Sequence, residues 1–185
     1  MRKNVLIINC SPVRTGATAE IVRTAGEALK DAGEVKEICI DDYRIGFCKG
    51  CRVCHTMAEC AQKDDHAALM DEFASADVIL CVSPSYWADI PGEFKVFIDR
   101  CTPWSNTHEP HAKLPAGKKG YVISLRTGPG IAEAEKVAGS IEHFYGHLEI
   151  KTGGKLCLTK VENKEDAIAR KTEITAFCRG IAEGL

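Results

Sequence analysis

Five short segments predicted to be strands alternate with segments of helical periodicity, and this alternation constrains the fold more than any other feature. The predicted strands span residues 4–9, 35–40, 78–83, 119–125 and 148–158. Residues 4–9 form an apolar run rich in branched residues, and 78–83 are likewise predicted to be buried, as expected for strands in a parallel sheet covered on both faces. Glycines 153 and 154 predict a bend or bulge in the last strand, because glycine weakens a strand interior. Helices are predicted at about 20–32, 64–76, 91–101, 131–145 and 164–182.

Strands that alternate with helices indicate βαβ units, a parallel sheet and helices on both of its faces. With right-handed crossovers and five strands, this pattern predicts a doubly wound α/β fold of three layers, α/β/α. The expected strand order is 2-1-3-4-5, the flavodoxin-like order. Residues 1–185 are predicted to form one domain. Residues 43–63 show no clean periodicity and are predicted to be an irregular, cysteine-rich insertion.

Composition narrows the class of protein. The chain is 45% apolar and 27% charged, which is typical of a globular protein in water. Its net charge of −2 offers no electrostatic basis for binding nucleic acid or an anionic membrane. We expect a cytoplasmic protein, because no signal peptide or membrane span is visible in the sequence. Ten cysteines in a reducing compartment indicate metal or redox chemistry rather than disulfides.

Four of the cysteines form a compact motif with the spacing C-x2-C-x2-C-x5-C, namely Cys48, Cys51, Cys54 and Cys60. Ferredoxin-type iron–sulfur clusters are held by a similar C-x2-C-x2-C core. Disulfides explain the motif poorly, because cysteines on one tight turn rarely meet the geometry of the bond. Zinc sites usually divide their ligands into two separated pairs. Three interpretations stay open from the spacing: an iron–sulfur cluster, thiols without metal, and zinc.

The other six cysteines are scattered, mostly in apolar surroundings, and we expect them to be small core residues. They are Cys10, Cys39, Cys81, Cys101, Cys157 and Cys178.

In a doubly wound sheet, ligands bind beyond the carboxyl ends of the strands. The loop after the first strand has neither the G-x-G-x-x-G dinucleotide fingerprint nor a P-loop. It offers Ser11, Arg14, Gly16 and Thr18 just before a helix, and this arrangement suits a terminal monophosphate. An ordinary helix-capping loop is the alternative.

Two further loops reach the same edge of the predicted sheet. Tyr86 and Trp87 follow the third strand, where aromatic side chains can flank a planar ring; the alternative is that Trp87 is a buried anchor. The glycine-rich turn at 126–130 follows the fourth strand and can present backbone N–H groups. A phosphate and a flat ring without a dinucleotide signature indicate flavin mononucleotide, FMN.

Three groups of residues carry a family resemblance: Ser11-Pro12 with 16–19, the four-cysteine motif ending in Asp64-Asp65, and 84–87 continuing to 100. Over residues 4–130 the chain resembles the NADPH-dependent FMN reductase family, and more narrowly its iron–sulfur flavoprotein branch. The resemblance implies a flavodoxin-like fold, FMN bound by these loops, and a homodimer or homotetramer. The branch implies a [4Fe-4S] cluster on Cys48, Cys51, Cys54 and Cys60.

The predicted cofactor-binding residues are Ser11, Arg14, Gly16, Ala17, Thr18, Ala19, Pro84, Ser85, Tyr86, Trp87, Thr127, Gly128 and Gly130.

Three functions fit these observations. The first is a redox or electron-transfer flavoprotein with FMN and [4Fe-4S], exchanging electrons with a small molecule or a ferredoxin-type partner. The second is an NAD(P)H-dependent FMN or quinone reductase without a cluster. The third is a non-enzymatic zinc- or flavin-binding module. No acid–base catalytic residue is predicted, since electron transfer needs none.

Overall fold

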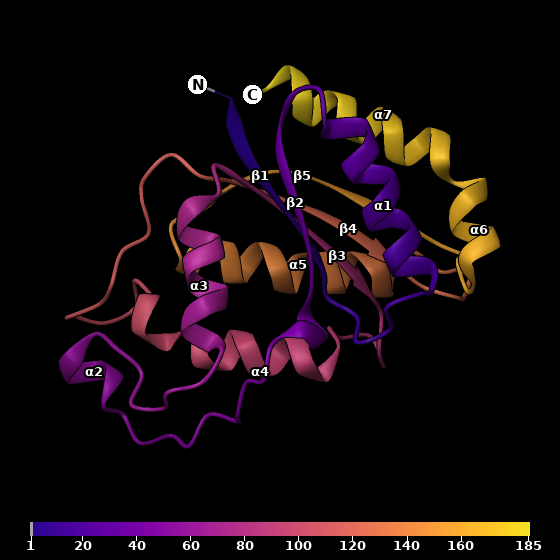
Figure 1. The fold of residues 1–185 in the computed structure, drawn as a ribbon. Helices are drawn as coiled ribbons and strands as arrows, with labels where there is room; N and C mark the ends of the chain where they lie inside the picture. Colours follow the sequence, from indigo (N-terminus) through magenta and orange to yellow (C-terminus); the bar gives the residue numbers. More distant parts are fainter. Residues whose placement is uncertain (1) are drawn as a thin grey trace.

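The computed structural model describes residues 2–185 and contains one five-stranded sheet. Its strands are β1 (Lys3–Asn9), β2 (Gly33–Cys39), β3 (Val78–Pro84), β4 (Lys119–Leu125) and β5 (Lys151–Leu158). All neighbouring strands are parallel, and their order is β2-β1-β3-β4-β5 (Figure 1). The predicted flavodoxin-like order is therefore confirmed.

Helices cover both faces of the sheet (Figure 1). On one face lie α1 (Ala17–Leu29), α6 (Lys164–Ala169) and α7 (Lys171–Glu183), and on the other lie α3 (His66–Ser75), α4 (Gly92–Arg100) and α5 (Ala132–His147). Alternate side chains of β1 enter the two cores: Val5 and Ile7 on the α1 side, Leu6 and Ile8 on the α4 side. A strand covered on both faces needs apolar residues at every position, and this explains its uninterrupted apolar sequence.

Helix α4 is fixed under the sheet by aromatic packing. Phe94 and Phe97 are fully buried. The Phe97 ring centroid lies 5.3 Å from that of Phe73 in α3 and 6.0 Å from that of Phe144 in α5. Such offset and edge-on contacts orient the helix as well as bury it. Consequently the last residue of α4, Arg100, is held at a defined place.

Several element boundaries differ from the predictions. The predicted helix 164–182 is two helices, α6 and α7, interrupted at Arg170, whose Nη2 donates a hydrogen bond to the Thr159 carbonyl at 2.9 Å. Strand β5 begins at Lys151 because α5 extends to His147 and residues 148–150 form the turn that follows it. The bulge predicted at the two glycines is present: the β4–β5 register skips Gly153.

The segment between residues 43 and 63 is irregular except for the four-residue helix α2 (Cys54–Met57). This segment, the cysteine loop, projects beyond α3 and the carboxyl end of α4 (Figure 1). Short 3-10 turns flank it in space, at Ile40–Asp42 and Thr102–Trp104.

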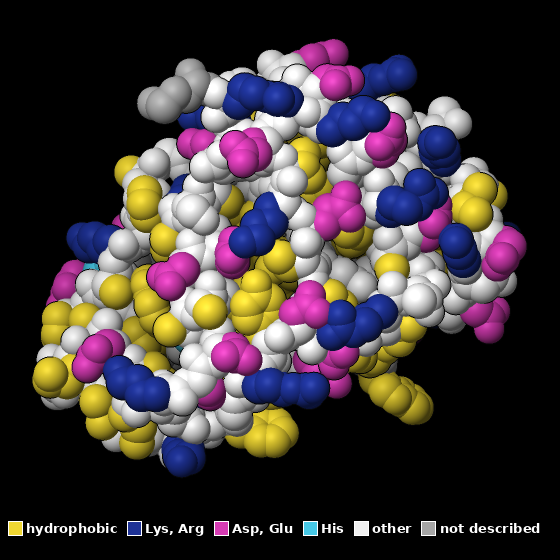
Figure 2. Space-filling view, viewed as in Figure 1, with side chains coloured by type: hydrophobic (Ala, Val, Ile, Leu, Met, Phe, Trp, Pro, Cys, Tyr) yellow, Lys and Arg dark blue, Asp and Glu magenta, His cyan; other side chains and the backbone are white. Residues whose placement is uncertain are grey.

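The outer surface carries charges of both signs. Lys and Arg side chains are interspersed with Asp and Glu over the face shown in Figure 2. None of the helices between residues 2 and 185 combines the length and apolar character needed to cross a membrane.

Candidate functional site

A cavity of about 180 Å³, the rim cavity, lies at the carboxyl ends of β1, β3 and β4. It is the switch point at which doubly wound sheets bind ligands. The residues that line it come from the loops after these strands and after β5. They are Ser11, Val13, Gly16, Ala17, Thr18, Pro84, Ser85, Tyr86, Leu125, Arg126, Thr127, Val161 and Glu162.

The N-terminus of α1 forms one wall of the rim cavity. Gly16 is the N-cap, and no side chain caps the helix. The first N–H groups of a helix have no intrahelical acceptor, so those of Ala17 and Thr18 are available to a ligand. The Cβ of any other residue at 16 would stand 3.1 Å from a methyl carbon of Val13. Glycine therefore leaves room for a ligand to approach the helix N-terminus. This wall suits an anion such as a phosphate.

Arg126 forms part of the opposite wall, directly after β4. Its Nη1 donates to the Gly130 carbonyl at 3.1 Å and pairs with Glu133 at 3.2 Å. Its Nε is buried, and none of the described residues accepts a hydrogen bond from it. An unsatisfied buried donor costs roughly 1–3 kcal/mol. A ligand oxygen in the rim cavity would remove that cost, so Arg126 fits an anionic or carbonyl-bearing ligand.

The structure brings eight of the predicted cofactor-binding residues to the rim cavity: Ser11, Gly16, Ala17, Thr18, Pro84, Ser85, Tyr86 and Thr127.

The other five predicted residues lie outside its lining. Arg14 is exposed and pairs with Asp41 and Asp42. Ala19 lies one residue further into α1. Gly128 and Gly130 contact the Arg126 side chain.

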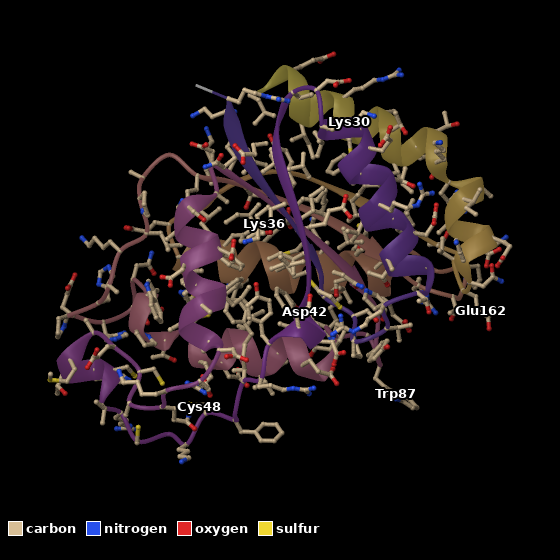
Figure 3. All side chains as sticks on the ribbon, viewed as in Figure 1. Lys30, Lys36, Asp42, Cys48, Trp87 and Glu162 are labelled. Atoms are coloured by element: carbon tan, nitrogen blue, oxygen red, sulfur yellow. The ribbon has the colours of Figure 1, made fainter. Side chains whose placement is uncertain are left out.

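Trp87 is fully exposed and has a positive φ of 55°, so its interpretation as a buried anchor is wrong. Its side chain projects away from the protein (Figure 3).

Sequence reasoning missed Val13, Leu125, Arg126, Val161 and Glu162. A signal was available for Arg126, which immediately follows a predicted strand at the edge where ligands bind. Val161 and Glu162 follow β5 at the same edge, and no residue type there marks a ligand.

A second cavity, of about 300 Å³, is lined by all four cysteines of the motif. We call it the cysteine cavity. Cys48, Cys51, Cys54 and Cys60 come from the projecting loop, and Asp99, Arg100, Thr102 and Pro103 close the other side. All ten cysteines of the chain are free thiols. Of the six expected in the core, Cys39 and Cys157 are only half-buried, since both lie near strand ends or edges; the other four are buried as predicted.

The loop turns tightly around the cysteine cavity. Gly50, Arg52 and Ala58 all adopt left-handed backbone conformations, with φ of 62°, 59° and 52°. Such conformations are uncommon for residues other than glycine and reverse the direction of the chain. They let one short segment present its four thiols to a common space.

Among residues 2–185, no three His, Cys, Asp or Glu side chains converge closely enough to hold one metal ion. A tetrahedral zinc site would require such convergence, with sulfur about 2.3 Å from the ion. In a four-iron cluster the four cysteine ligands surround an extended inorganic core instead. Four thiols lining one cavity therefore fit the donor set of such a cluster better than that of zinc.

Arg100 anchors the cysteine loop to α4. Its side chain is only 1% exposed, and its Nη1 lies 2.8 Å from Asp64 Oδ2 and 2.8 Å from the Gly46 carbonyl oxygen. Burial alone would raise the pKa of the Asp64 carboxyl, but the guanidinium and the N–H groups of Gly46 and His66 lower it to about 2. The ion pair joins both ends of the loop to the core.

Helix α4 follows the loop that carries Tyr86 and ends at the cysteine cavity. It begins at Gly92, after the loop that carries Tyr86 and Trp87, and ends at Arg100 beside the cysteines. Nine helical residues span roughly 13 Å at 1.5 Å each. In Figure 3, Cys48 and Trp87 lie toward opposite ends of α4 along the same edge of the protein. Helix α4 therefore joins a loop of the rim cavity to the cysteine cavity.

A parallel sheet of order 2-1-3-4-5, with an anion-suited helix N-terminus at its switch point, defines the flavodoxin-like class, in which FMN binds at this position. The model of the NADPH-dependent FMN reductase family matches residues 3–160. The chain belongs to this family.

Relatives and solved structures agree with this assignment. An iron-sulfur flavoprotein of Archaeoglobus fulgidus is 33% identical over 130 residues, covering 70% of this chain and 56% of the relative. An NAD(P)H:quinone oxidoreductase from Methanothermobacter marburgensis superimposes with a TM-score of 0.73 at 14% identity, covering 98% of this chain and 96% of the other. An FMN-dependent NADH-azoreductase of Bacillus anthracis, solved in complex with FMN, gives 0.70 at 14% identity, covering 97% and 99%.

The two structural likenesses establish the fold. The chain spans about half the length of the first iron-sulfur flavoproteins it matches, between 47% and 56% of them.

Proposed function

We propose that the chain is an FMN-dependent oxidoreductase that also holds a [4Fe-4S] cluster on Cys48, Cys51, Cys54 and Cys60. The observation that carries the proposal is the lining of one cavity by all four thiols, next to an arginine that donates to one of them. Membership of the FMN reductase family and likeness to a relative named iron-sulfur flavoprotein support it. When bound, FMN accepts electrons in pairs and releases them singly, and an iron–sulfur cluster carries one at a time.

The rim cavity would hold the phosphate end of FMN. Its volume of about 180 Å³ is below the roughly 300 Å³ at which drug-sized pockets begin, so it fits one part of the cofactor. The free N–H groups of α1 and the unpartnered Nε of Arg126 supply donors for phosphate oxygens. Tyr86 lines the cavity and is itself exposed, so the flavin ring would lie toward this side chain and Trp87.

NAD(P)H is the proposed electron donor, and a small molecule or a ferredoxin-type protein is the proposed partner in electron transfer. We also propose a homodimer or homotetramer. Phe47 and Trp87 support assembly, because both are large apolar side chains exposed by 79% and 101%. Both lie on the loops that carry the candidate sites.

The second candidate is an NAD(P)H-dependent FMN or quinone reductase without a cluster. The match to the NADPH-dependent FMN reductase family over residues 3–160 favours it, because that activity needs no iron–sulfur cluster. On this alternative, the four cysteines of the motif are free thiols.

The variant Cys48→Ser tests the cluster, with Cys157→Ser as the matched control. Cys157 is half-buried in β5 and lines neither cavity. In protein purified without oxygen, we expect Cys48→Ser to lose most of its iron, labile sulfide and broad visible absorption while it keeps FMN. Cys157→Ser should keep all of these. If parent protein contains FMN but neither iron nor sulfide, the cluster is refuted and the second candidate stands.

A further inference from the structure

Arg100 makes a contact that its role as an anchor does not require. Its Nε donates a hydrogen bond to Cys60 Sγ at 3.2 Å. The two residues are forty positions apart, on α4 and on the cysteine loop, so the contact depends on the tertiary fold. Because the side chain is almost completely buried, water does not compete for this hydrogen bond.

The guanidinium is held rigidly in place. Its Nη2 donates to Asp64 Oδ1 at 3.1 Å and to the Gln62 carbonyl at 3.4 Å. Its Nη1 donates to Asp64 and to the Gly46 carbonyl. A guanidinium has five N–H groups, and with the sulfur contact each has an acceptor. Arg100 therefore cannot leave Cys60 without breaking a bidentate pair with Asp64.

We propose that Arg100 is a positioning residue that raises the reduction potential of the cluster through its hydrogen bond to Cys60 Sγ. This inference rests on the proposed function. Reduction adds negative charge to a cluster and its thiolates, and a fixed N–H donor at a ligand sulfur stabilises the more negative state. Asp64 opposes this effect, because its carboxylate pairs with the same guanidinium and offsets part of its charge.

Arg100 and Asp64 therefore have opposite effects on the reduction potential of the cluster. Arg100→Lys keeps one positive charge but cannot reach Cys60 and both Asp64 oxygens with a planar fork. We expect the cluster to be at least tenfold harder to reduce, which for one electron is a potential about 59 mV lower. Asp64→Asn removes the negative charge and keeps one acceptor oxygen, whereas Asp64 uses one oxygen for the Gly46 N–H and the other for the His66 N–H. Arg100 is then less compensated, so the potential should rise.

Arg52→Met is the matched control. Arg52 lines the same cavity and carries the same charge, but it is exposed and donates no hydrogen bond to a cysteine. If the effect comes from the directed N–H donor, this variant should shift the potential much less than Arg100→Lys. An equal shift would replace the proposal by a general effect of charge.

The test is an anaerobic redox titration of the cluster in the FMN-loaded protein, followed by visible absorption and electron paramagnetic resonance. The flavin potential in the same sample is the internal reference and should not move. An unchanged cluster potential in Arg100→Lys overturns the inference while the proposed function stands, whereas parent protein without iron overturns the proposed function itself. If Arg100→Lys binds no cluster, Asp64→Asn is compared with Asp99→Asn, which removes a carboxylate that lines the same cavity but pairs with Lys95. A larger rise of the potential in Asp64→Asn supports the inference, and an equal or smaller rise refutes it.

Discussion

His66 is a buried histidine beside the cysteine loop, and its surroundings keep it neutral. Its Nε2 lies 3.5 Å from Cys101 Sγ, and its ring packs against Phe97 and Trp104 with centroids 5.2 and 5.5 Å away. Burial, and after it the positive charge of Arg100, lowers the pKa of His66 to about 4. As the pH falls through about 6.5, His66 therefore takes up a proton in the unfolded chain. In the folded protein it stays neutral at that pH.

This difference makes stability depend on pH in a known direction. The contribution of His66 is fully present above about pH 6.5 and is lost as the pH falls toward 4, because the unfolded state binds the proton first. Between pH 7.5 and 5.5 we expect a loss of about 1.3 kcal/mol in the free energy of unfolding. Urea unfolding of His66→Phe should show a loss smaller by about this amount. Equal pH slopes in His66→Phe and the parent would contradict the account.

Arg100 and Arg126 show what sequence reasoning misses at the scale of single residues. A charged residue at the end of a helix is usually exposed, yet Arg100 is buried because α4 ends beneath the cysteine loop. The place of Gly16 and Thr18 in the lining of the rim cavity was predictable. Small and hydroxyl residues at the start of a helix predict an anion site by local chemistry alone. Burial of a charge depends on distant segments and has no local signature.

At the scale of elements, the contact between β4 and α5 depends on Gly120. A Cβ at this position would stand 2.4 Å from the ring of Tyr145, which is fully buried. The Tyr145 hydroxyl also donates to the Tyr121 carbonyl at 3.2 Å, so the ring cannot move without losing that hydrogen bond. The helix can approach the sheet this closely only over glycine.

Gly120→Ala should therefore lower the free energy of unfolding by about 2 kcal/mol, as overpacking does in a rigid core. Gly139→Ala is the control, because it lies within α5 with no atom within 4 Å of the added Cβ. That variant should stabilise the protein by roughly 0.5–1 kcal/mol, because alanine loses less backbone entropy in a helix. Calorimetric melting of both variants is the measurement. A Gly120→Ala protein as stable as the parent would show that this packing is looser than described.

The three central strands were predictable because each is a nearly continuous apolar run, a pattern that a sheet covered on both faces imposes. The edge strands β2 and β5 carry charged side chains, and the alternation of strands with helices predicted them. The interruption at Arg170 was not, since the apolar spacing continues through it and a hydrogen bond to the Thr159 carbonyl accompanies the break. Helix α2 was also missed, because four residues are too few to show a helical period.

At the scale of the whole molecule, the two candidate sites lie on one edge of the protein, and α4 runs from a loop of the rim cavity to the cysteine cavity. The fold and the rim cavity belong to the sheet, and both follow from rules that hold for doubly wound sheets in general. The cysteine cavity is built from a loop outside the sheet, so its contents depend on four thiols and on Arg100. The bound FMN, iron and sulfide therefore decide whether both redox centres are present.

The most direct test is the content of FMN, iron and labile sulfide per chain in protein prepared without oxygen. The account predicts about one FMN, four iron and four sulfide per chain. FMN without iron or sulfide would contradict the second centre and leave a flavin-dependent reductase. Protein without FMN would contradict the assignment of the rim cavity, and with it the central claim.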